Sequence, residues 1–197
     1  MLHRLLAALS VAVTFMACVP APVRADILSE EILSGGAPRG RFSGSLFGGS
    51  SPIPRTTVNF ASADPPGTII INTSERRLYL VLGNGQAIRY GIGVGRVGFT
   101  WAGVTRVVSK REWPDWTPPS QMLRRRPDLP RHMRGGPENP LGARAMYLGS
   151  TLFRIHGSNE PETIGQAVSS GCFRLTNDDV IDLYGRVRVG AKVIVLR

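Results

Sequence analysis

The hydrophobic positions from residue 68 onward fall in short runs that are typical of β-strands. Residues 68–72 (TIIIN) form a β-branched run, and residues 77–82 (RLYLVL) alternate apolar and polar side chains. The turn sequence Gly83-Asn84-Gly85 follows, and residues 86–92 continue as an extended segment. This pattern predicts a β-hairpin near the start of a folded domain.

The rest of the domain adds more strands and one helix. Extended segments are expected at residues 104–110, 145–148, 151–155 and 191–197. Thr176 is a suitable helix N-cap, with Asp178 and Asp179 in the first turn. One face of the helix is apolar, at Val180, Ile181, Leu183, Tyr184 and Val187, and the helix should end near Gly190. The pattern therefore predicts a mainly β domain with a C-terminal helix.

The first 25 residues have the features of a secretory signal peptide. His3 and Arg4 precede the apolar run at residues 5–19, and the sequence Val-Arg-Ala ends at Ala25. Prolines close the apolar run before it reaches the roughly 20 residues that a bilayer span needs. Lipidation of Cys18 is the alternative, and we favour cleavage after Ala25. The mature chain would then keep a single cysteine and no transmembrane span.

Residues 26–66 are rich in Gly, Ser, Pro and Arg and have neither helical nor strand periodicity. Such a segment buries little apolar surface to offset the cost of ordering it, so we expect a flexible tether. The chain of 197 residues is long enough for one hydrophobic core, which we place at residues 67–197. The Gly and Pro content and the two cysteines exclude a helical bundle and a disulfide-rich scaffold.

Most of the positive charge lies on and around a long Pro/Arg-rich loop at residues 113–140, which we call the basic loop. Residues 106–154 carry ten Lys or Arg against four acids, a net charge of +6. The loop holds seven prolines, two tryptophans and the triplet Arg124-Arg125-Arg126, and the chain as a whole carries a formal charge of +10. A solvated face and a surface for an anionic partner are both compatible with this charge. An exported chain with no recognition motif is not expected to bind nucleic acid, so an anionic polymer of the cell envelope fits better.

The chemically informative residues lie between His156 and the helix. His156 ends a predicted strand, and Cys172 follows sixteen residues later, just before the helix start. A cysteine reacts as the thiolate, and the helix start, Arg174 and His156 would each favour that form. The alternative is an inert buried cysteine. His132 is expected at the surface, and the spacing of His and Cys does not support a metal site.

The same residues resemble the signature of the L,D-transpeptidase catalytic domain of the YkuD type. The resemblance rests on His156-Gly157-Ser158, on Ile164-Gly165, on residues 169–175 (SSGCFRL) and on Asn177-Asp178-Asp179. It covers about residues 68–197. It implies a β-sandwich-like catalytic domain without a cofactor that acts on peptidoglycan stem peptides through a cysteine thioester.

The resemblance also implies a role for each matching residue. Cys172 would be the nucleophile and His156 the general base, oriented by the carbonyl of Gly157. Backbone amides of Gly171 and Cys172 would form the oxyanion hole. Substrate-binding roles are expected for Arg174, Ser169, Ser170 and Ser158.

The implied reaction removes the terminal D-Ala of a tetrapeptide stem and transfers the acyl group to an amine. That amine would belong to another stem, giving a cross-link, or to an envelope protein, giving anchorage. The expected location is the periplasm. Two alternatives stay open from the sequence alone: a sortase-like cysteine transpeptidase, and a non-catalytic basic module that binds the cell envelope.

Overall fold

The computed structural model describes residues 51–197 of the chain. The predicted signal peptide, the alternative of lipidation at Cys18 and the first part of the predicted tether therefore lie outside the described residues. None of the described helices is long and apolar enough to span a bilayer.

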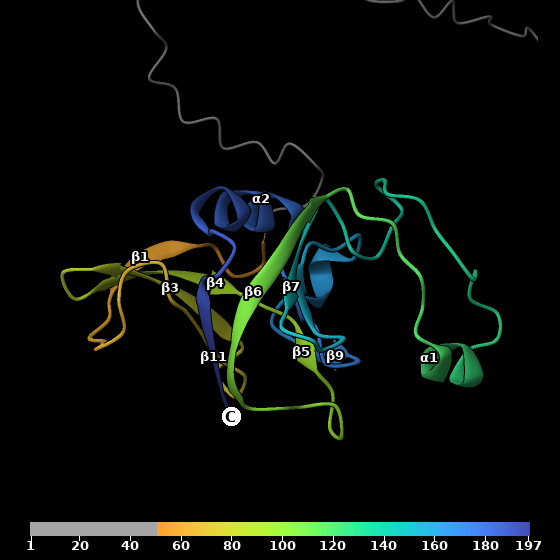
Figure 1. The fold of residues 1–197 in the computed structure, drawn as a ribbon, viewed down its shortest axis with the longest axis horizontal. Helices are drawn as coiled ribbons and strands as arrows, with labels where there is room; N and C mark the ends of the chain where they lie inside the picture. The colour runs from red at the N-terminus through yellow and green to blue at the C-terminus, as the bar shows by residue number, and fades with distance from the viewer. Residues whose placement is uncertain (1–50) are drawn as a thin grey trace, which may run out of the picture. The chain divides into compact units, whose positions relative to one another are not determined.

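A nine-stranded mixed sheet organises the described residues (Figure 1), in the order β1-β4-β3-β2-β11-β6-β7-β8-β10, and β5 and β9 form a separate parallel pair. The strands are β1 (Thr56–Asn59), β2 (Ile69–Asn72), β3 (Arg77–Gly83), β4 (Gln86–Gly91), β5 (Val94–Gly95), β6 (Gly103–Glu112), β7 (Arg144–Leu148), β8 (Arg154–His156), β9 (Ala167–Ser169), β10 (Phe173–Arg174) and β11 (Lys192–Leu196). The helices are α1 (Ser120–Arg125), the single 3-10 turn η1 (Pro161–Thr163) and α2 (Asn177–Arg186).

The long strand β6 joins the two halves of the sheet (Figure 1). Its first half pairs with β11, and its second half pairs with β7, with a register shift between Val107 and Ser109. A bulge of this kind bends a strand and increases its local twist. The β2–β4 hairpin region and the β7–β10 region therefore form two faces around a shared core, which agrees with the predicted β-sandwich-like domain.

The core lies between the two halves of the sheet and α2. Alternate residues of the strands point inward, and Ile71, Tyr90, Met146 and Phe173 are each 1% exposed or less. The prediction of a mainly β domain with a C-terminal helix is confirmed. Helix α2 begins as expected, because the Thr176 side chain accepts a hydrogen bond from the amide of Asp179 at 3.3 Å.

Helix α2 ends earlier than the sequence pattern indicates. Its last helical residue is Arg186, and the next residue, Val187, is extended but remains 2% exposed. The backbone of Val187 is not helical, but its side chain packs against the same core as the helix. Its apolar character therefore matches the helical periodicity although the helix has already ended. Residues 151 and 152, which were expected to begin a strand, lie in a turn, and β8 starts at Arg154.

The tether prediction is wrong for residues 51–66, because part of this segment is folded. Strand β1 pairs antiparallel with β4, from Thr56 opposite Arg89 to Asn59 opposite Gln86. Three of the four β1 side chains are exposed, so this edge strand leaves no hydrophobic pattern in the sequence. Backbone pairing and polar contacts hold it in place.

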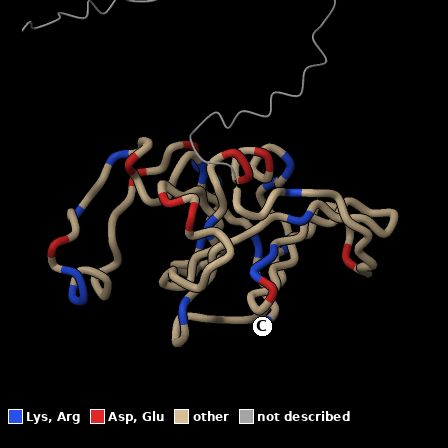
Figure 2. Tube along the Cα trace, turned by 180° about the vertical axis from the view of Figure 1, so that it is seen from behind, with Lys and Arg blue, Asp and Glu red and all other residues tan. Residues whose placement is uncertain are grey.

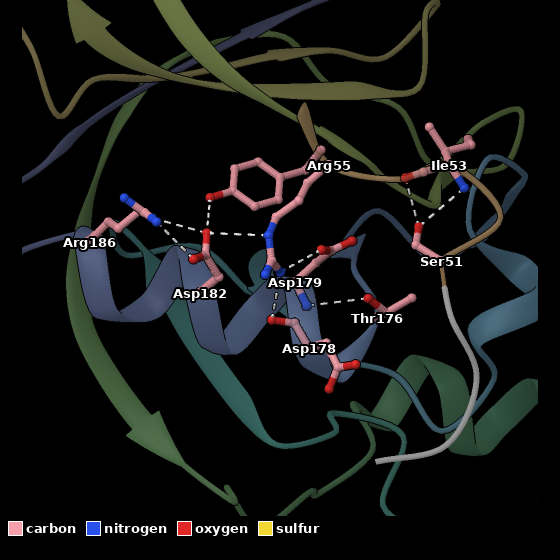
Figure 3. A network of polar contacts seen from close by, with 9 residues as sticks. Ser51, Ile53, Arg55, Thr176, Asp178, Asp179, Asp182 and Arg186 are labelled. Atoms are coloured by element: carbon pink, nitrogen blue, oxygen red, sulfur yellow. Dashed lines mark hydrogen bonds and ion pairs between the residues drawn. The ribbon is translucent and has the colours of Figure 1, made fainter. Parts of the chain in front are cut away.

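Arg55 connects this segment to helix α2 (Figure 3). Its guanidinium donates to Asp179 Oδ1 at 3.0 Å and to the carbonyl of Asp178 at 3.3 Å, and lies 4.0 Å from Asp182. Asp182 also accepts a hydrogen bond from Tyr90 at 2.6 Å and pairs with Arg186. Because Asp179 is 4% exposed, burial raises the pKa of its carboxyl, and the nearby Arg55 opposes that shift.

We predict that Arg55→Ala lowers the free energy of unfolding by about 1 to 2 kcal/mol, since it removes the cation from a buried carboxylate while Arg55 itself is partly solvated. The loss should be smaller at pH 4 than at pH 7, because a protonated Asp179 needs no cation. Arg126→Ala, which removes an exposed pair with Asp128, is the control and should leave the free energy of unfolding unchanged at both pH values. Urea unfolding at both pH values measures this, and equal losses for the two variants would contradict it.

Candidate active site

The candidate active site lies on the paired strands β8 and β10. They run parallel, with Ile155 opposite Phe173 and His156 opposite Arg174, and the amide of Leu175 donates to the carbonyl of His156 at 2.8 Å. Continuing this register by one residue sets Cys172 beside Arg154. Ile155 and Phe173 point into the core. Alternation therefore places the side chains of Arg154, His156, Cys172 and Arg174 on the opposite face of the strand pair.

His156 is held in one orientation and one tautomer. Its side chain is 4% exposed, and its Nδ1 lies 2.6 Å from the carbonyl oxygen of Gly157. A carbonyl only accepts, so Nδ1 carries the proton and donates it, which leaves Nε2 as the free acceptor. Burial, reinforced by the positive charge of Arg174, lowers the pKa of His156 to about 3. The imidazole is therefore neutral across the physiological pH range.

Cys172 is partly buried and lies close to the backbone of the turn before β8. Its Sγ lies 3.8 Å from the carbonyl oxygen of Leu152, which is the hydrogen-bond partner of the thiol. Burial raises the pKa of the thiol, while Arg154, through its charge and hydrogen bonds, and Arg174, through its charge, act in the opposite direction. The expectation that its surroundings lower this pKa is thus wrong for the resting site, because desolvation outweighs the two cations.

The side chain of Ser169 organises the loop that carries the cysteine. Its hydroxyl donates to the carbonyl of Cys172 at 2.7 Å and accepts from the amide of Gly171 at 3.1 Å. Ser169 is only 2% exposed, so the structure gives it a positioning role in place of the expected substrate contact. The Gly171 amide, expected in an oxyanion hole, already has a partner, which leaves the Cys172 amide as the better candidate donor.

Position 171 requires glycine, because of both the backbone conformation there and the atoms that surround it. Its φ is +109°, and a Cβ built on it would lie 2.5 Å from Cε1 of Phe153 and 3.1 Å from the carbonyl oxygen of Phe99. A side chain at this position would push the cysteine loop away from Phe153. The close approach of the loop to Phe153 therefore depends on glycine.

Gly157 and Ser158 support the histidine strand from within the domain. A Cβ on Gly157 would lie 2.3 Å from Asn177 Oδ1, which accepts a hydrogen bond from the amide of Ala143 at 2.8 Å. Ser158 is 3% exposed, and its hydroxyl accepts from the amide of Glu160 at 3.0 Å. Ser158 therefore fixes the turn after His156, and the expected direct contact with substrate does not fit its burial.

Arg174 and Ser170 remain near the surface of the site. The Arg174 guanidinium pairs with Glu160 at 2.9 Å, with the Glu160 side chain 52% exposed. A substrate carboxylate would have to share Arg174 with Glu160 or displace it. Ser170 is partly buried at the tip of the cysteine loop.

Sequence reasoning missed several residues that line or support the site. Arg154 lies two positions before His156, and strand alternation alone would have placed both on one face. Trp101 stacks on Phe153 with ring centroids 4.8 Å apart, and it also packs near Phe173. The sequence gives no signal for the Trp101 contact, because it joins residues more than fifty positions apart.

The basic loop has a fixed base and an exposed tip. Trp116 and Met133 exchange backbone hydrogen bonds of 2.8 Å, and the Asn139 side chain donates to the carbonyls of Pro114, Met133 and Arg134. Figure 2 shows Lys and Arg positions gathered at the tip of the loop, around α1. His132 is exposed and lies 3.3 Å from Asp115, as expected for a surface residue.

The tip of the basic loop reaches the segment beside the cysteine loop. The guanidinium of Arg125 lies over the ring of Phe99, 5.2 Å from its centroid. The carbonyl oxygen of Phe99 is in turn one of the atoms closest to Gly171. Within residues 51–197, no group of three or more His, Cys, Asp or Glu side chains is placed to hold a metal ion.

Comparison with known families matches residues 66–195 to the model of the L,D-transpeptidase catalytic domain, YkuD. The chain belongs to this family. The match includes β8, the cysteine loop and α2, and it begins after β1, so the Arg55 segment lies outside it. Membership excludes the sortase-like alternative.

Curated relatives carry the same family name. The chain is 39% identical to the "Probable L,D-transpeptidase ErfK/SrfK" of Escherichia coli over 137 residues, which cover 65% of this chain and 43% of that protein. It is 37% identical to the "Probable L,D-transpeptidase YcfS" of the same organism over 142 residues, covering 67% and 44%. The chain thus spans less than half the length of these relatives.

Solved structures share the fold. An L,D-transpeptidase from Mycobacterium smegmatis matches with a TM-score of 0.54 at 17% identity, covering 66% of this chain and 58% of that one, which supports the fold alone. A crystal structure from Brucella melitensis is 45% identical with a TM-score of 0.51, covering 75% and 96%. It carries the name "Probable carnitine operon oxidoreductase caia", so the family assignment of this chain rests on the family model and the curated relatives.

We predict that Gly171→Ala lowers the free energy of unfolding by about 2 to 4 kcal/mol, from backbone strain at positive φ and overlap with Phe153. It should also change the rate at which a neutral thiol reagent labels Cys172, because the cysteine loop must move. Gly185→Ala in α2 is the matched control: nothing lies within 4 Å of the new Cβ, and alanine favours the helix, so stability should rise by roughly 0.5 kcal/mol. Thermal unfolding with timed labelling tests both, and an unchanged G171A variant would contradict the packing argument.

Proposed function

We propose that this chain is a peptidoglycan L,D-transpeptidase that works through a thioester on Cys172. The single observation that carries the proposal is the β8–β10 pairing, which sets Cys172 and His156 on one face of adjacent strands in a domain of this family. The two side chains lie diagonally across the strand pair, and the imidazole offers an unprotonated Nε2. In the proposed mechanism the thiol rotates away from the Leu152 carbonyl and directs its proton to that nitrogen.

The first half-reaction forms the acyl-enzyme. The Cys172 thiol gives its proton to Nε2 of His156, and the sulfur attacks the carbonyl carbon of the third stem residue, expected to be meso-diaminopimelate. The developing oxyanion is stabilised by the Cys172 amide. The carbon–nitrogen bond then breaks, the terminal D-Ala leaves as an amine that takes the proton from Nε2, and a thioester remains.

The second half-reaction transfers the acyl group. An acceptor amine loses a proton to Nε2 of His156 and attacks the thioester carbon, and the carbon–sulfur bond breaks as the sulfur regains a proton from His156. The acceptor belongs to a second stem or to an envelope protein. The neutral state of His156 supports this cycle, because only an unprotonated Nε2 can accept each proton in turn.

The same proposal places the protein in the periplasm. The features of residues 1–25 support export, and an exported enzyme would meet its peptidoglycan substrate there. A non-catalytic envelope-binding module is the competing function, and it would leave Cys172 without an acyl adduct.

We predict that incubation with a tetrapeptide stem adds the mass of the acylated stem, less the terminal D-Ala, to the wild-type chain. Cys172→Ala should form no adduct, and His156→Gln should acylate at least about 100-fold more slowly, the usual range for a general base. The acylation rate should rise with pH above 7, because the pKa of the buried thiol is raised and its thiolate fraction grows. Intact mass spectrometry over time measures all three.

Acylation by a carbapenem, read by the same mass measurement, serves as a second donor. The His132→Gln variant is the control, since His132 is an exposed histidine outside the site, and it should behave as wild type. A wild-type chain that forms no adduct with either donor would favour the non-catalytic module.

The basic loop is proposed to act as a lid over the acyl-enzyme. Its fixed base holds the exposed tip in place, and Arg125 extends the loop to Phe99 beside the cysteine loop. A cover of this kind would exclude water from the thioester and favour attack by an amine.

We predict that replacing residues 117–131 with a short Gly/Ser linker raises the ratio of hydrolysis to aminolysis by about tenfold, because water then reaches the thioester more easily. Residues 113–116 and 132–140 stay, so the base keeps its hydrogen bonds. Product analysis by mass with a fixed acceptor concentration gives the ratio. If trimming changed neither donor binding nor this ratio, the loop would not be a lid.

A further inference from the structure

Two arginines meet over one aromatic ring beside the cysteine loop. The guanidinium carbon of Arg96 lies 4.5 Å from the centre of the Phe99 ring, and that of Arg125 lies 5.2 Å from it. Arg96 directly follows β5, whereas Arg125 is the last residue of α1 at the tip of the basic loop. Two segments far apart in the sequence therefore bring their positive charges to the same ring.

The turn that carries Arg96 and Phe99 is fixed against the cysteine loop. The amide of Phe99 donates to the carbonyl of Arg96 at 2.9 Å, and Gly98 has a φ of +84°, so this stretch is a tight β-turn. The amide of Arg96 donates to the carbonyl of Ser169 at 3.0 Å, and the Phe99 carbonyl oxygen would lie 3.1 Å from a Cβ on Gly171. The ring and the two cations over it are thus held next to the residues that carry the cysteine.

Neither of these guanidiniums has a carboxylate partner within residues 51–197. Other arginines nearby do, since Arg126 pairs with Asp128 at 2.6 Å and Arg174 pairs with Glu160 at 2.9 Å. Contact with a ring uses the face of a guanidinium and leaves the N–H donors at its edge free. Two like charges at one ring also repel each other, and an anion between them removes that repulsion. A carboxylate is the anion that matches the geometry of these donors.

We propose that Arg96 and Arg125 bind the carboxylate of the acceptor, on the carbon that carries the attacking amine. This inference rests on the proposed function and names the acceptor class, a second stem in place of an envelope protein. In the diaminopimelate side chain of a stem, the amine and a carboxylate share one carbon, so the carboxyl carbon lies about 2.5 Å from the attacking nitrogen. The amine of a lysine side chain or of a protein N-terminus has no carboxylate on that carbon.

The bound carboxylate would assist the second half-reaction in two ways. It orients the acceptor, because one group rests on the arginines while the amine faces the thioester. The two cations also lower the pKa of the neighbouring ammonium group, and only the unprotonated amine attacks. The amine nitrogen then bonds to the thioester carbon, the carbon–sulfur bond breaks, and the proton passes through His156 to the sulfur. The carboxylate itself takes no part in this exchange.

The proposed site differs from a lid in what it distinguishes. A cover that excludes water changes the fate of the acyl-enzyme in the same way for every acceptor. A pair of arginines that binds a carboxylate favours the acceptors that carry this group and has no effect on those that lack it. Comparison of matched acceptors therefore separates the two roles of the basic loop.

Three tripeptide stems that end in diaminopimelate test the proposal as acceptors. They react with the acyl-enzyme that the purified chain forms with an isotope-labelled tetrapeptide stem, so the hydrolysis product of the donor can be told from the acceptor by mass. The first acceptor has both diaminopimelate carboxylates. The second has a carboxamide on the carbon that carries the attacking amine, and the third has its carboxamide at the C-terminal end.

The measured quantity is the ratio of cross-linked to hydrolysed product at equal acceptor concentration. The wild-type chain should give a ratio at least about tenfold higher with the first acceptor than with the second, as expected for a hydrogen bond between charged groups. The third acceptor should behave like the first. A short peptide with a free N-terminal amine and no acidic residue represents a protein acceptor, and it should behave like the second.

Variants then assign the discrimination to residues. Arg96→Gln and Arg125→Gln should each bring the first and second acceptors close to equal, by lowering use of the first. Arg125→Lys keeps the charge and should keep part of the discrimination. Arg124→Gln is the matched control, because Arg124 is the adjacent exposed arginine of α1, while the described contacts of the Phe99 ring with cations are those of Arg96 and Arg125. It should keep the wild-type discrimination.

Each outcome has a distinct meaning. A wild-type chain that forms no acyl-enzyme would overturn the proposed function and this inference with it. An acyl-enzyme that uses the first and second acceptors equally would overturn the carboxylate site alone. Arginine variants that lower use of both acceptors by the same factor would give these side chains a role in the lid or in the cysteine loop, which also overturns the site. If the neutral peptide amine were used better than the first stem, the acceptor class would be an envelope protein.

Discussion

The parallel pairing of β8 with β10 is the constraint on which the candidate site depends, since it sets the positions of Cys172 and His156. Both strands are too short to be stable alone, at three and two residues. They persist because Ile155 and Phe173 are buried side by side in the core, and because the Leu175 amide bonds the His156 carbonyl. Ile155 and Phe173 alternate with the functional residues along the two strands. By burying these two side chains, the hydrophobic core fixes where the functional side chains lie on the opposite face.

Burial gives the site its electrostatic character. A desolvated cysteine and a desolvated histidine both favour their neutral forms. In the resting site the thiol therefore keeps its proton, and the imidazole is unprotonated at Nε2 and able to accept it. Arg154 and Arg174 lower the energy of a thiolate but also disfavour an imidazolium.

The sequence predicts those parts of the structure whose pattern is local. The β3–β4 hairpin, the helix cap at Thr176 and the order of His156 and Cys172 all follow from periodicity, turn residues or spacing within a few residues. The strands β5, β9 and β10 have two or three residues each, which is too few to show a period. Their pairing depends on contacts far apart in the chain. The sequence likewise does not show that Ser158 and Ser169 are buried, because a serine that binds substrate and a serine that fixes a loop cannot be told apart from sequence.

The segment before the family domain also helps to hold the elements that support the candidate site. The side chain of Ile53 lies where a Cβ on Gly91 or Gly165 would be, so two glycines leave the space that it fills. Arg55 then pairs with Asp179 near the start of α2, and α2 begins three residues after β10 (Figure 3). Residues 51–59 thereby brace the helix that follows the cysteine strand. Since the pairing of β8 with β10 depends on the core that α2 covers, the contacts of this segment support the site from outside the family match, which begins at residue 66.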